Sequence, residues 1–156
     1  KRPAILPVQS ARRQLGTKRH NVVDRNGIPL ALLLSGANEH DCTQHDDTWD
    51  SMILVAPDPA EVTQHAALDK GYDNQYCRGF LKDKGYRVHI PKKGLDTTLR
   101  EQDPQYPARR WVVERTGSWH NRFRRLKIRY KVKAENYLAF VQLANAIICF
   151  RSCHNG

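Results

Sequence analysis

The segment from residue 63 to 90 most constrains the fold, because it predicts a strand, a helix and a second strand in close succession. The first expected strand covers residues 63–68 and the second covers residues 86–90. Asp73 is expected to cap the intervening helix, and Gly85 suits its C-terminal end. Two strands joined in this way normally lie parallel, with a right-handed crossover. The chain is therefore predicted to have an α/β fold.

An antiparallel hairpin is predicted ahead of this unit, from a strand over residues 17–24 and another over residues 28–35. The connection ends in Asn26 and Gly27, a pair that tolerates the positive φ angles of tight turns. The second strand is almost wholly apolar, which is typical of a strand buried on both faces. Two antiparallel strands are therefore expected at the start of the domain.

Two further helices are expected, one after the hairpin and one at the end of the chain. The first would be capped by His40 or Asp41 and run to about Leu54. Its predicted inner face comprises Cys42, His45, Trp49, Met52 and Ile53. The second covers residues 137–151 and is unusually apolar, which predicts that it is well buried or lies in an interface.

The composition points to a polyanionic partner. Of the 156 residues, 26 are Lys or Arg and 16 are Asp or Glu, which gives a formal net charge of +10.

One domain is expected over residues 16–152, after a basic loop over residues 1–15, and residues 92–107 are expected to form a polar loop. The spacing of the four cysteines matches no zinc pattern, so single buried thiols in a reducing compartment are expected. No apolar run could span a bilayer and no signal peptide is evident, which predicts a cytoplasmic protein without membrane contact.

Most of the positive charge lies in residues 109–133, which read as one long helix with a tail. This stretch has ten basic residues and a single acid, Glu114, so it carries a net charge of +9. One face is apolar, with Val112, Thr116, Trp119, Phe123 and Leu126 at helical spacing. Glu114 points away from that face. It could form a helix salt bridge with Arg110 or Arg115, or it could bind a metal on a surface that holds a polyanion.

Asp69 provides a second carboxylate, at the carboxyl end of the first parallel strand. Ligands and catalytic groups gather at such strand ends in open sheets, although an Asp before Lys-Gly often only shapes a turn. Carboxylates from separate elements, such as Asp69 and Glu114, can together hold Mg²⁺, which prefers carboxylate, phosphate and water oxygens. Paired ions activate an attacking oxygen and stabilise the leaving one in phosphodiester chemistry.

The chain resembles the catalytic domain of bacterial insertion-sequence transposases of the DDE type, which have a ribonuclease-H-like fold. The similarity runs over nearly all of residues 16–151. It rests on the segments Gly16–His20, Val23–Pro29, Ser35–Asp41, Leu68–Asp73, Arg110–Thr116, Asn121–Leu126, Arg129–Tyr130 and Leu138–Phe140. The resemblance implies a mixed sheet flanked by helices. It also implies DNA transposition by metal-dependent phosphodiester hydrolysis and strand transfer at the ends of a mobile element.

In this family three acids bind two Mg²⁺ ions, for which Mn²⁺ can substitute. The resemblance places two of these acids at Asp69 and Glu114, as catalytic and metal-binding residues. The first Asp belongs on an earlier strand, expected upstream of Lys1, so the sheet should lack its first strand. Asp24 lies in the hairpin turn and Asp41 begins a helix, where capping suits it better.

The helix around Glu114 matches the family signature in part. Arg110, four residues before the Glu, agrees with it, whereas Pro107 and Asn121 replace a Tyr and a Lys. The expected partner is double-stranded DNA, at the element ends and at the target, with a homodimer possible. DNA-binding residues are expected at Arg110, Arg115, Arg122, Arg124, Arg125, Lys127 and Arg129.

Two alternatives to an active enzyme stay open at this point. One is a DNA-binding remnant of a transposase that no longer catalyses, since only two of the three acids are evident and this chain alone is expected to be inactive. The other is an unrelated basic RNA-binding protein. The Asp69–Glu114 pattern and the lack of an aromatic stacking platform disfavour it.

Overall fold

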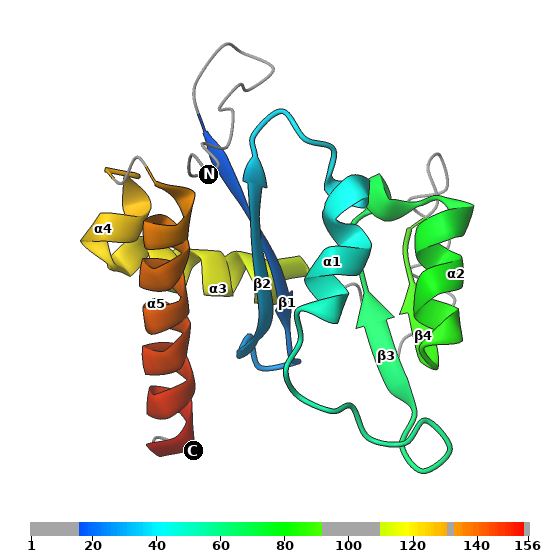
Figure 1. The fold of residues 1–156 in the computed structure, drawn as a ribbon. Helices are drawn as coiled ribbons and strands as arrows, with labels where there is room; N and C mark the ends of the chain where they lie inside the picture. The colour runs from blue at the N-terminus through cyan, green and yellow to red at the C-terminus, as the bar shows by residue number, and fades with distance from the viewer. Residues whose placement is uncertain (1–15, 92–109, 131–132, 155–156) are drawn as a thin grey trace.

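The computed structural model describes residues 16–91, 110–130 and 133–154, and these form a mixed α/β structure (Figure 1). Two expected loops, residues 1–15 and 92–107, lie outside this part of the chain. In chain order the elements are β1 (Thr17–Val23), β2 (Pro29–Gly36), the 3-10 helix η1 (Asp41–Gln44), α1 (His45–Asp50), β3 (Gln64–Ala67), the 3-10 helix η2 (Lys70–Tyr72), α2 (Gln75–Asp83), β4 (Tyr86–His89), α3 (Arg110–Arg122), α4 (Arg124–Lys127) and α5 (Ala134–His154).

The hairpin of β1 and β2 confirms the prediction from the Asn-Gly turn. The two strands pair antiparallel, from Thr17 opposite Gly36 to Val23 opposite Pro29. Gly27 has a φ of +79°, a conformation that glycine adopts without strain. The Asp24 carboxylate closes the turn by accepting hydrogen bonds from the backbone N–H groups of Asn26 and Ile28, at 2.8 and 2.7 Å.

The strand–helix–strand unit also forms as predicted. β3 and β4 pair parallel, with Gln64 opposite Tyr86, and α2 connects them. The predicted cap is wrong by one residue, because the Asn74 side chain accepts the hydrogen bond from the Cys77 N–H at 2.7 Å. Asp73 forms an ion pair with Arg78 instead, at 2.7 Å. Gly85 has a φ of +83° just after the helix, as its predicted C-terminal role requires.

The helix predicted from residue 40 to 54 is shorter and divided. His40 does cap its start, with the ring nitrogen accepting from the Cys42 N–H, but a 3-10 turn comes first and α1 ends at Asp50. Asp46 and Asp47 lie in the first turn of α1, where the helix dipole favours negative charge, but no basic residue lies in its last turn, which ends in Asp50. Ile53 is consequently 93% exposed, and its predicted place on the inner face is wrong.

The long basic helix is broken into two, contrary to the prediction of one continuous helix. Phe123 has extended backbone angles, φ −81° and ψ 104°, and separates α3 from α4. The break lets α4 turn Leu126 into a buried cluster with Tyr137, Val141 and Ala144 of α5. Phe123 packs against the same cluster, so apolar burial compensates for the missing helical hydrogen bonds.

The four described strands form two separate two-stranded sheets, β1–β2 and β3–β4. α1 contacts β1, β2 and α2, and η1 contacts η2, so these short helices join the two sheets (Figure 1). α3 packs on β1, while α5 packs on β2. Among the described residues, each of the four strands has one edge without a strand partner.

Two buried histidines should make the fold less stable in mild acid. Burial lowers the pKa of both His20 and His120, against smaller opposing effects of Asp41 on the first and Asn145 on the second. As the pH falls through the ordinary value of about 6.5, the unfolded chain takes up protons before the folded chain does. The free energy of unfolding, measured by urea titration, should therefore fall between pH 7.5 and pH 5.5.

Replacing both histidines by Gln tests this source of the pH dependence. The double variant should show a smaller loss of stability over the same pH interval, whatever its stability at pH 7.5. An equally steep loss in the double variant would assign the pH dependence to other groups.

Candidate active site and nucleic-acid interface

The helix that carries Glu114 is held in place by the turn of the hairpin. The buried Thr116 hydroxyl donates to the Gly27 carbonyl at 2.7 Å. One turn further on, the Arg19 guanidinium of β1 donates to the Asn121 side chain at 3.1 Å. The orientation of α3, and with it that of Glu114, thus depends on the first two strands.

Arg115 adds to this attachment and is not directed at solvent. Its guanidinium donates to the Asn26 carbonyl in the turn. The same group lies over the rings of Trp111 and Trp119, at 4.7 and 5.1 Å from their centroids. Arg115 therefore has a structural role, whereas the sequence placed it among the DNA-binding residues.

Glu114 lies exposed on α3 and forms no ion pair within the part of the chain that the structure describes. The helix salt bridge to Arg115 is therefore absent, because that guanidinium is bound to the turn. The side chain of Arg110 lies outside the described part of the chain. An exposed carboxylate on a helix with several cations is thus available to a ligand.

Asp69 lies two residues after β3, which ends one residue earlier than predicted, and its side chain is exposed. One carboxylate oxygen accepts from the Lys70 N–H at 2.7 Å and so caps η2. The turn-shaping role considered from the sequence is therefore present. That contact fixes the carboxylate at the end of the strand, where a catalytic acid is expected in an open sheet.

The 3-10 helices η1 and η2 contact each other, and Asp69 caps the second of them. The Cys42 thiol of η1 donates to the Gly71 carbonyl of η2 at 3.0 Å. Between them Tyr72 is largely buried. Its pKa is raised first by burial, then by the negative charge of Asp41, by nearby thiols and by Asp69. Asp41 and Asp69 thus both act on the Tyr72 hydroxyl.

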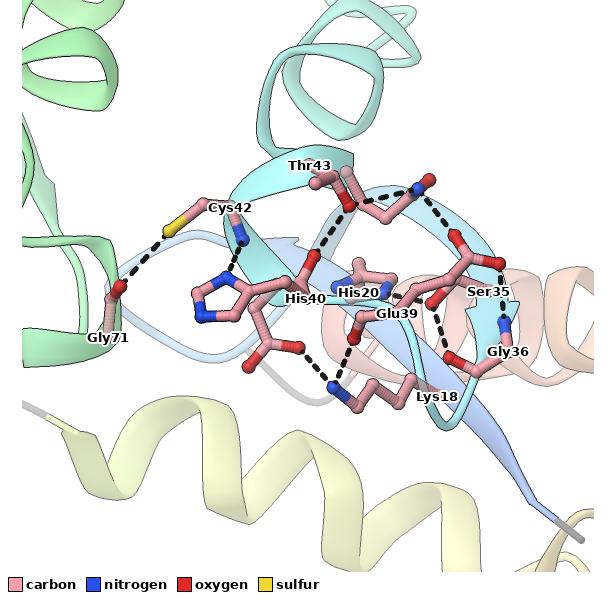
Figure 2. Close-up of polar contacts among 11 residues, drawn as sticks. Lys18, His20, Ser35, Gly36, Glu39, His40, Cys42, Thr43 and Gly71 are labelled. Atoms are coloured by element: carbon pink, nitrogen blue, oxygen red, sulfur yellow. Dashed lines mark hydrogen bonds and ion pairs between the residues drawn. The ribbon is translucent and has the colours of Figure 1, made fainter. Parts of the chain in front are cut away.

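Asp41 does not cap the helix, which corrects the role expected for it. Its carboxylate accepts from the Lys18 ammonium at 2.9 Å, and Lys18 also donates to the Glu39 carbonyl at 2.6 Å. Figure 2 shows Lys18 directed at the loop that carries Glu39 and His40. This link from β1 to η1 was missed from the sequence. The only signal in the sequence was Asp41 itself, for which a local capping role was predicted.

The carboxylates at Asp69 and Glu114 are of the right chemical type for Mg²⁺, which prefers hard oxygen donors. Among the described residues no three His, Cys, Asp or Glu side chains converge closely enough to hold a metal ion. All four cysteines are described and none is in a disulfide, as expected, although Cys153 is exposed. A complete two-ion site would need a further ligand.

The basic surface formed by the end of α3 and by α4 is solvent-exposed. Arg122, Arg124, Arg125 and Lys127 are all exposed. Arg129 is half-buried instead, where it donates to the Thr17 hydroxyl and lies over the Tyr137 ring. Four of the predicted DNA-binding residues are therefore exposed on the adjoining ends of α3 and α4, with Arg125 lying over the Phe140 ring, and these four are called the α3–α4 patch below.

Comparison with known proteins agrees with these features. The family described as "Transposase DDE domain" matches residues 7–149. A putative transposase for insertion sequence element IS402 from Burkholderia cepacia is 35% identical over 154 residues, which cover 97% of this chain and 71% of that protein. The transposase for IS1106 from Neisseria meningitidis serogroup B is 29% identical over 135 residues, which cover 80% of this chain and 44% of that protein.

A third relative, the putative transposase for IS6501 from Brucella ovis, is 25% identical over 136 residues, covering 86% of this chain and 98% of its own length. No solved structure gives a significant match. The strand-end Asp, the acid on a basic helix and these similarities define an insertion-sequence transposase. The chain belongs to the DDE transposase family. None of the described helices is long and apolar enough to cross a membrane.

Proposed function

We propose that this chain is the catalytic core of a transposase that carries out metal-dependent cleavage and strand transfer of DNA at the ends of an insertion sequence, and that it needs a further metal-binding acid to do so. Asp69 and Glu114 are the proposed metal-binding and catalytic carboxylates. The observation that carries the proposal is the state of Glu114. It is an exposed acid on a basic helix, without an ion pair in the described residues, although Arg115 is its neighbour.

In the proposed mechanism the carboxylates would hold metal ions and the basic patch would bind the DNA backbone. Divalent ions, Mg²⁺ or Mn²⁺, would supply Lewis acidity that activates an oxygen nucleophile and stabilises the leaving oxygen. Asp69 and Glu114 would hold the ions at the strand end and on α3. The α3–α4 patch would bind the DNA phosphates and so position the backbone relative to the carboxylates. Water is the nucleophile for cleavage, and a DNA 3′-hydroxyl is the nucleophile for strand transfer.

We further propose a ribonuclease-H-like arrangement in which one more strand joins the two sheets. The two-stranded sheets support this, because each described strand has one edge without a strand partner and an unpaired edge favours the addition of a further strand. Such a strand could also bring the third carboxylate. Asp24 is poorly suited to that role, since its carboxylate is bound to the turn by two backbone N–H groups.

DNA binding through the α3–α4 patch is tested by salt dependence. Replacing Arg122, Arg124 and Arg125 by Ala should weaken binding to duplex DNA. It should also flatten the plot of log affinity against log salt by about 0.9 for each phosphate that is no longer neutralised. Fluorescence anisotropy with a labelled duplex at several salt concentrations measures both effects.

The matched control replaces three exposed basic residues elsewhere, Arg25, Lys82 and Arg87, which changes the net charge equally. The slope of log affinity against log salt for this control should stay closer to that of the unmodified chain. Equal flattening in both triple variants would show that only net charge matters, and the α3–α4 patch would then not be the binding surface.

A remnant that binds DNA without cleaving it is the second candidate. It is favoured by the lack of a third metal-binding side chain among the described residues. DNA binding with the salt slope above, but no strand cleavage in Mg²⁺ or Mn²⁺ by the complete gene product, would establish it.

A further inference from the structure

α5 presents a regular apolar seam to solvent. The seam consists of Asn136, Ala139, Leu143, Ala146, Phe150 and Cys153, which follow one another at steps of three and four residues. All six are exposed among the described residues, Leu143 at 57% and Phe150 at 63%. This is the spacing of the a and d positions of a coiled coil, with Leu143 and Phe150 at a.

The seam lies on the opposite side of the helix from the protein core. Tyr137, Val141, Ala144 and Ile148 form the buried line, at the same spacing. Figure 1 shows α5 at the outer side of the molecule. The helix is therefore apolar on both faces, and the contacts among the described residues account for only one of them.

Large and small side chains alternate along the seam, so the seam is complementary to a second copy of itself in the opposite direction. We propose that α5 pairs antiparallel with α5 of a second copy of this chain, through this seam. In an antiparallel pair centred between residues 144 and 145, Leu143 meets Ala146 of the other copy. Phe150 likewise meets Ala139. Both of these layers join a large side chain to a small one, which fills the space evenly, and Asn136 meets Cys153 at the ends of the seam.

A parallel pair fits the seam poorly. It would place Leu143 against Leu143 and Phe150 against Phe150, with Ala–Ala layers between them. Crowded layers would alternate with empty ones, and both are unfavourable. The alternation in size therefore selects the antiparallel arrangement.

The charges at the two ends of α5 agree with the same arrangement. Glu135 lies in the first turn, whereas Arg151 and His154 lie in the last, and the seam between them is uncharged. An antiparallel pair brings Glu135 of one copy toward the basic end of the other, and this happens twice by symmetry. A parallel pair would place like charges together. The inference does not depend on the catalytic proposal.

Sedimentation equilibrium of the 156-residue chain in 1 M NaCl tests the pairing, since that salt removes bound nucleic acid. The unmodified chain should form a dimer. Leu143→Glu should raise the dimer dissociation constant by roughly 100-fold, because it buries a charge twice. The control Ile53→Glu, at an exposed site outside α5, should leave it unchanged.

The helix content of Leu143→Glu should match that of the unmodified chain, because the replaced side chain is exposed. A monomer at all concentrations, or a dimer that Leu143→Glu leaves intact, would overturn the proposal.

Two further variants test the orientation. Ala146→Leu should weaken an antiparallel dimer by about tenfold, because it puts two leucines into one layer, whereas it would strengthen a parallel one. Asn136→Cys should allow a disulfide to Cys153 of the second copy under mild oxidation, identified by peptide mass spectrometry. Tighter association of Ala146→Leu, or a Cys153–Cys153 link in the unmodified chain, would refute the antiparallel pairing.

Discussion

Asp69→Asn and Glu114→Gln are each expected to lower the rate of Mg²⁺-dependent DNA strand cleavage by about 1,000-fold or more. Each change keeps the shape of the side chain but removes a negative oxygen donor. The loss of several kcal/mol of transition-state stabilisation by a metal corresponds to a rate effect of that size. Nicking of supercoiled plasmid by the purified transposase that contains this domain measures the rate.

The controls are Asp83→Asn and Glu61→Gln, which neutralise exposed acids on other elements. Both should cleave at the unmodified rate. Duplex binding without metal should be as strong in the Asp69 and Glu114 variants as in the unmodified protein, because removing a negative charge does not weaken contact with phosphates. Cleavage within about tenfold of the unmodified rate in either variant would contradict the assignment of that residue.

Elements with strong local signals could be predicted from the sequence. The Asn26-Gly27 turn and the cap at Gly85 need positive φ, and both glycines have it. The parallel pairing of β3 and β4 followed from the helix between them. The element boundaries that were predicted wrongly depend on tertiary contacts. α3 ends at Arg122 because burial of Leu126 against α5 favours a break, and no local signal at Phe123 indicates it.

The candidate site could be predicted only in part, for the same reason. The strand-end position of Asp69 and the outward direction of Glu114 follow from spacing along single elements. The position of Arg115 could not be foreseen, because its partner Asn26 lies 89 residues away in the sequence. The link from Lys18 to Asp41 likewise spans 23 residues. Pairings between distant segments leave no trace in local periodicity.

The hairpin turn should control the stability of the fold through its contact with α3, and Gly27→Ala tests this dependence. A Cβ atom at Gly27 would lie 3.1 Å from the Thr116 hydroxyl and 3.2 Å from the Arg115 guanidinium. The φ of +79° would add strain for any residue with a side chain. Together these effects should lower the free energy of unfolding by about 1–3 kcal/mol, as measured by urea titration.

Gly117→Ala is the matched control, because it makes the same chemical change on α3 itself. A Cβ atom there meets nothing within 4 Å, and the residue lies within a helix. The free energy of unfolding should therefore rise by about 0.5–1 kcal/mol, since alanine loses less conformational entropy than glycine. Opposite signs for the two variants would show that the turn supports the helix carrying Glu114. If Gly27→Ala were neutral or stabilising, α3 could not depend on the close packing of the turn.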